Sequence, residues 1–164
     1  MTLFSRTKAK FLIQNLKANG KKVVFTNGCF DIIHKGHTTY LKLARGLGDF
    51  LIIGLNSDAS VTKLKGPNRP INYETIRAAN LLKLDYVDAV TIFSEETPQR
   101  IIEDLQPDFL VKGGDYEADN IVGADRVRSY GGQVVILPFV SGYSTTNIIE
   151  KQLEKDLTEE DVSD

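Results

Sequence analysis

The 164-residue sequence has no tryptophan, one cysteine and two histidines, and these scarcities narrow the chemistry it can support. A single cysteine excludes an internal disulfide and is typical of a reducing compartment, so we expect a cytoplasmic protein. Cys29, His34 and His37 are its only thiol and imidazoles. This set is too small for a structural zinc site, and we predict no metal held by protein side chains alone.

Long apolar runs and an excess of one charge are also missing. No stretch approaches the ~20 apolar residues that cross a bilayer. The net charge of −2 provides no basic surface of the kind that binds nucleic acid. We therefore predict neither a membrane nor a nucleic-acid partner. A hydrophobic content of 41% in a chain of this length fits one domain with its own core.

The first 30 positions contain no acidic residue, which raises the question of a targeting segment. The apolar stretch 11–13 is too short for a secretory signal. Charge alone would also fit a transit peptide, but a helical apolar stripe formed by Ala9, Leu12, Ile13 and Leu16 favours a packed helix. We predict that residues 1–22 form this helix, that residues 23–153 form the catalytic domain, and that the acidic segment 154–164 is a frayed end.

Short apolar runs alternate with helical patterns along the rest of the chain. Strands are expected at residues 23–27, 50–55, 87–93, 108–112 and 133–137. They are rich in Val, Ile and Phe with little alternation, as in strands buried between two helical layers. The predicted fold class is α/β, with an open, parallel, five-stranded sheet and helices on both faces. In such a sheet, the ligand crevice lies at the carboxyl ends of the central strands.

The segment 26–37 (TNGCFDIIHKGH) joins the first predicted strand to a helix and carries both histidines. Its glycines allow backbone N–H groups to approach a ligand closely. His34 and His37 lie three residues apart around the first helical turn, near unpaired N–H groups and the positive end of the helix dipole. This arrangement predicts a phosphate site. The alternative is a corner in which the histidines only cap and pack.

Two further blocks follow the second strand. Asn56, Ser57 and Asp58 end that strand and begin a short helix, so capping alone would explain them. In the following segment 64–70 (LKGPNRP), Lys65 and Arg69 are the cations among turn residues. Two fixed cations beside a phosphate site suggest a clamp on the pyrophosphate or on the acceptor's phosphate, although a solvated loop would have the same composition.

Two more blocks follow later strands. In residues 111–116 (VKGGDY), the glycines would let a purine or ribose lie against the backbone, and Asp115 could accept from ribose hydroxyls or help place a metal. A tight turn with a capping Asp is the alternative. Residues 142–146 (GYSTT) precede another helical pattern and would form either an ordinary cap or a second anion site for the β- and γ-phosphates.

The spacing Gly28-x-Phe30-Asp31-x-x-His34-x-Gly36-His37 resembles the HxGH signature of the nucleotidyltransferases that include the cytidylyltransferases. The strings at 26–37, 55–58, 64–72, 111–116 and 142–146 together resemble one branch, the adenylyltransferases that activate glycero-manno-heptose 1-phosphate. The resemblance spans residues 23–149. It implies a Rossmann-like fold and transfer of AMP from ATP to a sugar 1-phosphate. It also implies Mg²⁺ carried with ATP, and a separate heptose kinase that supplies the substrate.

The motifs and the resemblance give candidate residues for three roles. Catalysis is assigned to His34, His37 and Lys65. Nucleotide binding is assigned to the two histidines and to residues near the strand ends: Asn27, Gly28, Cys29, Phe30, Gly36, Lys112, Gly114, Asp115, Tyr143, Ser144 and Thr145. Substrate binding is assigned to acidic, amide and cationic groups of the earlier loops: Asp31, Asn56, Asp58, Lys65 and Arg69.

Two other functions stay open at this level. Glycerol-phosphate cytidylyltransferases share the histidine motif and the Ser-Thr-Thr string, but typically carry an arginine where this chain has Phe139. A nucleotide sensor without activity would not need both histidines and the cationic loop. A homodimer is also open, because the apolar stripe of the first helix could cover either another subunit or the chain's own sheet.

Overall fold

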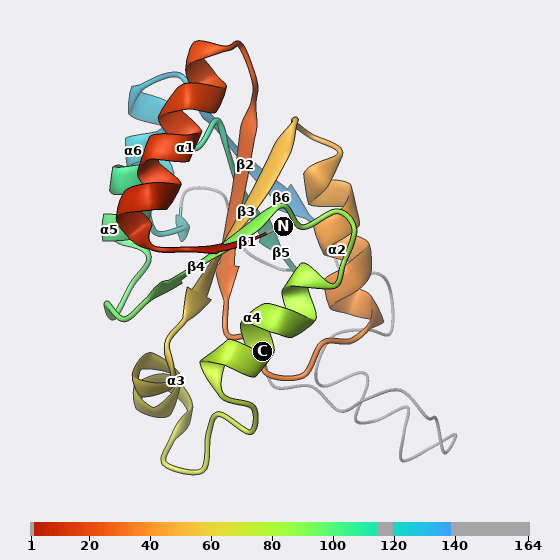
Figure 1. Cartoon of the computed structure of the whole chain (residues 1–164). Helices are drawn as coiled ribbons and strands as arrows, with labels where there is room; N and C mark the ends of the chain where they lie inside the picture. The colour runs from red at the N-terminus through yellow and green to blue at the C-terminus, as the bar shows by residue number, and fades with distance from the viewer. Residues whose placement is uncertain (1, 115–119, 139–164) are drawn as a thin grey trace.

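The computed structural model describes residues 2–114 and 120–138, and the chain forms a six-stranded parallel sheet between two helical layers (Figure 1). The strand order is β1-β4-β3-β2-β5-β6. The strands are β1 Thr2–Phe4, β2 Val23–Gly28, β3 Phe50–Asn56, β4 Ala89–Phe93, β5 Phe109–Gly113 and β6 Gln133–Leu137. The helices are α1 Arg6–Ala18, α2 Lys35–Arg45, α3 Asp58–Lys65, α4 Glu74–Leu82, α5 Gln99–Leu105 and α6 Ala124–Ser129.

Each face of the sheet has its own hydrophobic core. Helices α1, α5 and α6 cover one face, where Ile13, Ile101 and Val127 pack on Phe25 and Ile52. Helices α2 and α4 cover the other, with their buried side chains packed on strand residues that include Val24, Leu51 and Val111. Figure 1 shows these groups of helices on opposite sides of the strands. The parallel α/β class predicted from unalternated apolar strands is confirmed.

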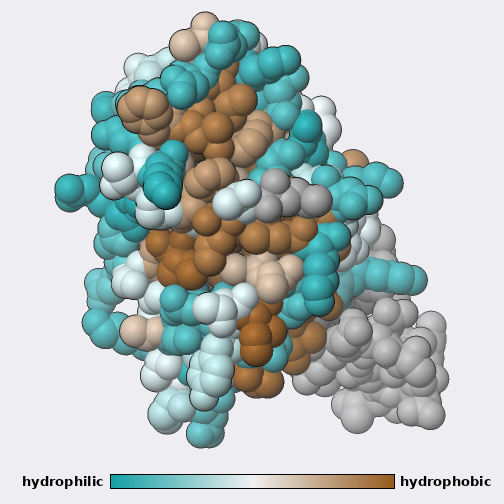
Figure 2. Space-filling view, in the orientation of Figure 1, coloured by the Kyte–Doolittle hydropathy of each residue, from teal (hydrophilic) through white to brown (hydrophobic). Residues whose placement is uncertain are grey.

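The prediction of five strands is wrong, because β1 adds a sixth. Residues 2–4 pair in parallel with residues 89–91 of β4 and form one edge of the sheet. Three residues are too few to show a strand pattern, and only the open edge of β4 makes them a strand. Figure 2 shows hydrophobic surface gathered around this edge, where the Leu3 side chain is 43% exposed.

The amino-terminal helix forms as predicted, but it is preceded by this strand. Ser5 caps α1 by accepting a hydrogen bond from the N–H of Lys8, and the helix ends at Ala18 before Asn19 and Gly20. Ala9 and Ile13 are fully buried against the chain's own sheet. Of the two explanations for the apolar stripe, the structure therefore supports packing within the chain, and this stripe gives no support to a homodimer.

The sheet topology fixes the place of a ligand site. β2 pairs with β3 on one side and with β5 on the other, so the chain leaves β2 toward one half of the sheet and later returns to the opposite side. The loops that follow such strands diverge and leave a crevice at their carboxyl ends. The histidine segment follows β2, and the block at 111–114 ends β5.

Candidate active site

The two histidines form the amino-terminal cap of α2. His34 is the N-cap residue, and its Nδ1 accepts a hydrogen bond of 3.0 Å from the N–H of Gly36. The Nδ1 of His37 accepts in turn from the N–H of His34, at 3.4 Å. A backbone N–H can only donate, so each Nδ1 presents a lone pair. In the neutral rings the proton is therefore on Nε2, and both Nε2–H groups are donors at a helix N-terminus.

The two histidine rings pack against each other in a tilted arrangement, and the ring of His37 also packs, tilted, against Phe30. The ring centroids of His34 and His37 are 3.9 Å apart, and those of Phe30 and His37 are 5.1 Å apart. Phe30 lies against Gly28, where a Cβ atom would come within 2.8 Å of the Phe30 ring. Glycine is thus required at position 28 because this aromatic ring occupies the space, which gives the G-x-F part of the motif a physical reason.

Asp31 connects the histidine loop to the segment before α4. Its buried carboxylate accepts hydrogen bonds from the N–H groups of Ile71 and Asn72, at 2.7 and 2.8 Å, and from Nε of Arg69, at 3.1 Å. Burial by itself would raise the pKa of Asp31, but these donors outweigh it and hold the pKa below its usual value. Asp31, which is predicted to bind substrate, joins the histidine loop to residues 69–72 through these three hydrogen bonds.

The remaining candidates of the acceptor side lie around α3. Asn56 ends β3 and is 5% exposed. Ser57 is the N-cap of α3, and the carboxylate of Asp58 accepts from the N–H of Glu74 at 2.8 Å. Lys65 is the last residue of α3, so it belongs to a helix rather than to the predicted loop, and it is half-buried. The structure therefore brings Arg69 next to the histidine loop through Asp31 and places Lys65 four residues before it, at the end of a helix.

The end of β5 provides the other described part of the site. Lys112 lies within β5 and Gly114 directly follows it, with a φ of 94° and its N–H donating to the carbonyl of Leu137 at 3.0 Å. The positive φ explains the second glycine of the VKGGDY string. Asp115, Tyr143, Ser144 and Thr145 lie outside the described residues, as do Phe139 and the segment 154–164.

One buried acceptor in this region has no partner within the described part of the chain. Asn27 lies near the end of β2, and its Oδ1 atom is buried without a hydrogen bond to any described group. A buried amide oxygen without a donor is costly, so a ligand that donates to it would be bound favourably. This fits the assignment of Asn27 to nucleotide binding.

The described residues present donors and cations to a ligand rather than a cage of carboxylates. Within residues 2–114 and 120–138, no group of three or more His, Cys, Asp or Glu side chains is placed to hold a metal ion. In the same ranges, no helix is both long and apolar enough to cross a membrane. Donors and cations of this kind suit an anionic ligand.

Arg77, a fully buried residue of α4, is not among the residues predicted from the sequence. A signal for it was present, because Arg77 lies on the apolar face that Ala78 and Leu81 mark. An arginine is rarely buried on such a face unless it is paired.

Comparison with known proteins agrees with this geometry. Residues 25–151 match the cytidylyltransferase-like family. The bifunctional protein HldE of Trichlorobacter lovleyi is 58% identical over 139 residues, which are 85% of this chain and 28% of that protein. HldE of Syntrophotalea carbinolica is 51% identical over 150 residues, covering 92% of this chain and 31% of its own length. The chain thus spans about 30% of the length of these curated relatives.

Solved structures share the fold. The lipopolysaccharide core biosynthesis protein from Thermoplasma volcanium matches with a TM-score of 0.59 and 29% identity, over 74% of this chain and 98% of that one. Pantothenate synthetase from Thermus thermophilus matches with a TM-score of 0.59 over 85% of this chain and 62% of its own, and at 17% identity it supports the fold alone. With the family match covering the histidine segment and every strand from β3 to β6, this chain belongs to the cytidylyltransferase-like family.

Proposed function

We propose that the protein transfers AMP from ATP to a sugar 1-phosphate, specifically D-glycero-D-manno-heptose 1-phosphate, and so forms ADP-heptose and pyrophosphate. The observation that carries the proposal is the pair of histidine Nε2–H donors at the N-terminus of α2. The choice of heptose rests on the five strings shared with heptose 1-phosphate adenylyltransferases. The identity with HldE proteins, 58% and 51%, supports it.

The reaction is an in-line displacement at the α-phosphorus of ATP. An oxygen of the sugar phosphate forms the new P–O bond, the bond to the bridging oxygen of the β-phosphate breaks, and pyrophosphate leaves with the electron pair. The nucleophile is already an anion near neutral pH, so the enzyme contributes positioning and charge stabilisation rather than a general base. His34 and His37 donate from Nε2 to phosphate oxygens that gain charge in the transition state.

Cations on the acceptor side complete the site. Lys65 and Arg69 bind the acceptor's phosphate or the pyrophosphate, and Asp31 holds Arg69 next to the histidine loop at 3.1 Å. Asn27 accepts from the nucleotide through its buried Oδ1. The residues Lys112, Gly114, Asp115, Tyr143, Ser144 and Thr145 are assigned to the nucleotide as well. The use of ATP supports the cytoplasmic location that the single cysteine predicts.

Mg²⁺ enters this proposal as an ion carried by the triphosphate. The donor set of the described site, imidazole N–H, backbone N–H and cations, fits a phosphate group that already holds its metal. The ion would neutralise charge on the leaving pyrophosphate. A kinase reaction has to supply the sugar 1-phosphate, and the relatives that carry this domain within longer, bifunctional proteins fit such a partner activity.

A polyol-phosphate cytidylyltransferase, such as a glycerol-phosphate enzyme, is the second candidate, because the matching family is cytidylyltransferase-like. The test measures pyrophosphate release with ATP and with CTP against heptose 1-phosphate, hexose 1-phosphates and glycerol 3-phosphate. We expect release with ATP and heptose 1-phosphate, at least tenfold faster than any other pair. Release only with CTP and a polyol phosphate would establish the second candidate instead. No release with any pair would favour a nucleotide sensor.

A further inference from the structure

The guanidinium of Arg77 lies beneath the candidate site and contacts three separate segments of it. Its Nη1 donates to the carbonyl oxygens of Cys29 and Asn56, its Nε donates to the carbonyl of Asn72, and its Nη2 donates to Oδ1 of Asp58. Each of these four distances is 2.8 Å. Figure 1 shows α3 and the start of α4 at the end of the sheet where β2 and β3 finish.

The oxygens that accept hydrogen bonds from Arg77 belong to two parts of the proposed reaction centre, one that binds the nucleotide and one that binds the acceptor substrate. Cys29 lies in the loop that leads from β2 to the histidines, on the nucleotide side. Asn56 and Asp58 flank the start of α3, and Asn72 lies in the segment that Asp31 also holds, on the acceptor side. One planar, forked group thus fixes the nucleotide loop against the acceptor-side segments, which only an arginine can do with this geometry.

Stability alone is a poor explanation for this arrangement. Arg77 is 0% exposed, and Asp58, the carboxylate that it contacts, has a side chain that is 34% exposed. Burying a cation is costly, and well-packed apolar residues often stabilise such a position at least as well. Ala78 and Leu81 on the same helix show that this environment accepts apolar side chains.

We propose that Arg77 is a positioning residue for the transfer reaction: it sets the separation between the histidine donors and the acceptor-binding cations without touching either substrate. This inference rests on the proposed function. In-line transfer requires reacting atoms within about 3–3.5 Å of each other, and a misplacement of about 1 Å can cost roughly 10²-fold in rate. The residue would therefore affect both substrates at once, unlike a group that binds only one of them.

The test compares Arg77→Lys with Arg45→Lys. Arg45 donates from Nε to Asp88 at 2.8 Å and from Nη1 to the carbonyl of Gly48 at 2.8 Å, at the opposite end of the sheet, where β3 and β4 begin. Both changes keep the positive charge and replace the planar, forked guanidinium with an ammonium group. Assays are run well below the Tm of each variant. For Arg77→Lys we expect a KM for ATP and a KM for the acceptor that both rise, and a kcat/KM that falls about 10²-fold. For Arg45→Lys we expect a lower Tm with unchanged kinetics.

Three results would overturn the positioning role of Arg77. Unchanged kcat and KM in folded Arg77→Lys would overturn the proposal. So would a kinetic loss that Arg45→Lys reproduces, or an Arg77→Lys protein that is unfolded at every temperature, because each assigns the residue to stability alone. If the unmodified protein releases no pyrophosphate, the proposed function fails separately. The rise in Tm with ATP then becomes the readout. Its loss in Arg77→Lys but not in Arg45→Lys would support only a narrower role, in which Arg77 orders the nucleotide loop, and an equal rise in both variants would overturn that role too.

Discussion

At the scale of single residues, the site depends on which nitrogen of each histidine faces the ligand. The backbone N–H groups of Gly36 and His34 occupy Nδ1 of the two rings. In the neutral rings Nε2 carries the proton, and His37 packs in tilted geometry against both His34 and Phe30. The histidine side chains cap the helix, and in the proposed function they also bind the ligand. Substitution can separate these two roles.

His34→Asn separates these roles. Asparagine is among the best N-cap residues, and its Oδ1 replaces the Nδ1 acceptor, but nothing replaces the Nε2–H donor. We expect the free energy of unfolding to change by less than about 0.5 kcal/mol, because the cap survives. Pyrophosphate release should fall about 10²-fold or more, because one donor to the transition state is lost.

The matched variant is His34→Ala, which removes both the cap and the donor. It should lose the same turnover and, in addition, about 1 kcal/mol of stability. Urea unfolding and a pyrophosphate assay on both variants check the pair. A His34→Asn protein with the turnover of the unmodified enzyme would refute the donor role of Nε2.

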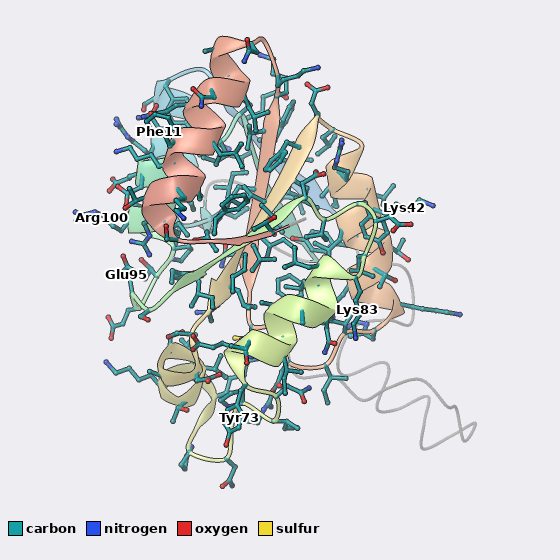
Figure 3. All side chains as sticks on the ribbon, viewed as in Figure 1. Phe11, Lys42, Tyr73, Lys83, Glu95 and Arg100 are labelled. Atoms are coloured by element: carbon teal, nitrogen blue, oxygen red, sulfur yellow. The ribbon has the colours of Figure 1, made fainter. Side chains whose placement is uncertain are left out.

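At the scale of elements, ion pairs join segments that are far apart in the sequence. Arg6, at the start of α1, donates to both carboxylate oxygens of Glu95 in the segment after β4, at 2.5 and 2.7 Å. Figure 3 shows Glu95 on the α1 side of the molecule, on the same side as Arg100. The bond from Arg6 lowers the pKa of Glu95 to about 2. This pair fastens the amino-terminal helix to the edge of the sheet.

Glu95→Gln tests this fastening through its pH dependence. A lowered pKa means that the native state favours the charged carboxylate. The charged carboxylate of Glu95 therefore makes its whole contribution to the free energy of unfolding above the pKa of the unfolded chain, about 4.3. This contribution is lost as the pH falls toward 2. The side chains are 27% and 39% exposed, so solvent screens the pair, and we expect a loss of about 0.2–1 kcal/mol at pH 7. Urea unfolding from pH 7 to 2 measures it.

The difference in unfolding free energy between Glu95→Gln and the unmodified protein should shrink as the pH falls from 5 to 2. It should also shrink in 1 M NaCl. Glu96→Gln is the control, because Glu96 is exposed and has no ion pair among the described residues. A constant difference across this pH range would mean that the charge of Glu95 does not stabilise the fold.

At the scale of the whole molecule, the site draws on loops that follow β2, β3 and β5, so a bound nucleotide should stabilise the entire domain. A ligand at 100 times its Kd adds about 2.7 kcal/mol to the free energy of unfolding. For a chain of this size, that corresponds to a rise in Tm of roughly 5–10 °C. Differential scanning fluorimetry with ATP and Mg²⁺ checks this.

The same measurement compares ATP with CTP as the nucleotide substrate. We expect ATP to raise Tm more than CTP at equal concentration, because the proposed function uses ATP. His34→Asn should keep most of this rise in Tm, because the donor that it lacks is proposed to stabilise the transition state rather than the bound nucleotide. Equal or larger stabilisation by CTP would contradict the adenylyl assignment and favour a cytidylyltransferase.

Much of this architecture was predictable from local pattern. Val and Ile runs placed the strands from 23 to 137, the apolar stripe of α1 was visible as helical periodicity, and helical patterns were recognisable between the strands. The short helix α6 and the strand β1 were not, because six and three residues hold too little periodicity to be recognised. The histidine segment was recognisable because its chemistry and its spacing lie within twelve consecutive residues.

Sequence alone determined the class of fold, the turn that carries both histidines and the family, since each depends on neighbouring residues and on the hydrophobic burial that their pattern encodes. Tertiary structure decided the partners of single polar groups. Asp31 accepts a hydrogen bond from Ile71, β1 pairs with β4 at the edge of the sheet, and Arg77 donates to the carbonyl of Cys29. Among these pairings, Asp31 and Ile71 are 40 positions apart and Arg77 and Cys29 are 48 apart. Hydrogen-bond geometry between distant segments leaves no periodic trace in a sequence.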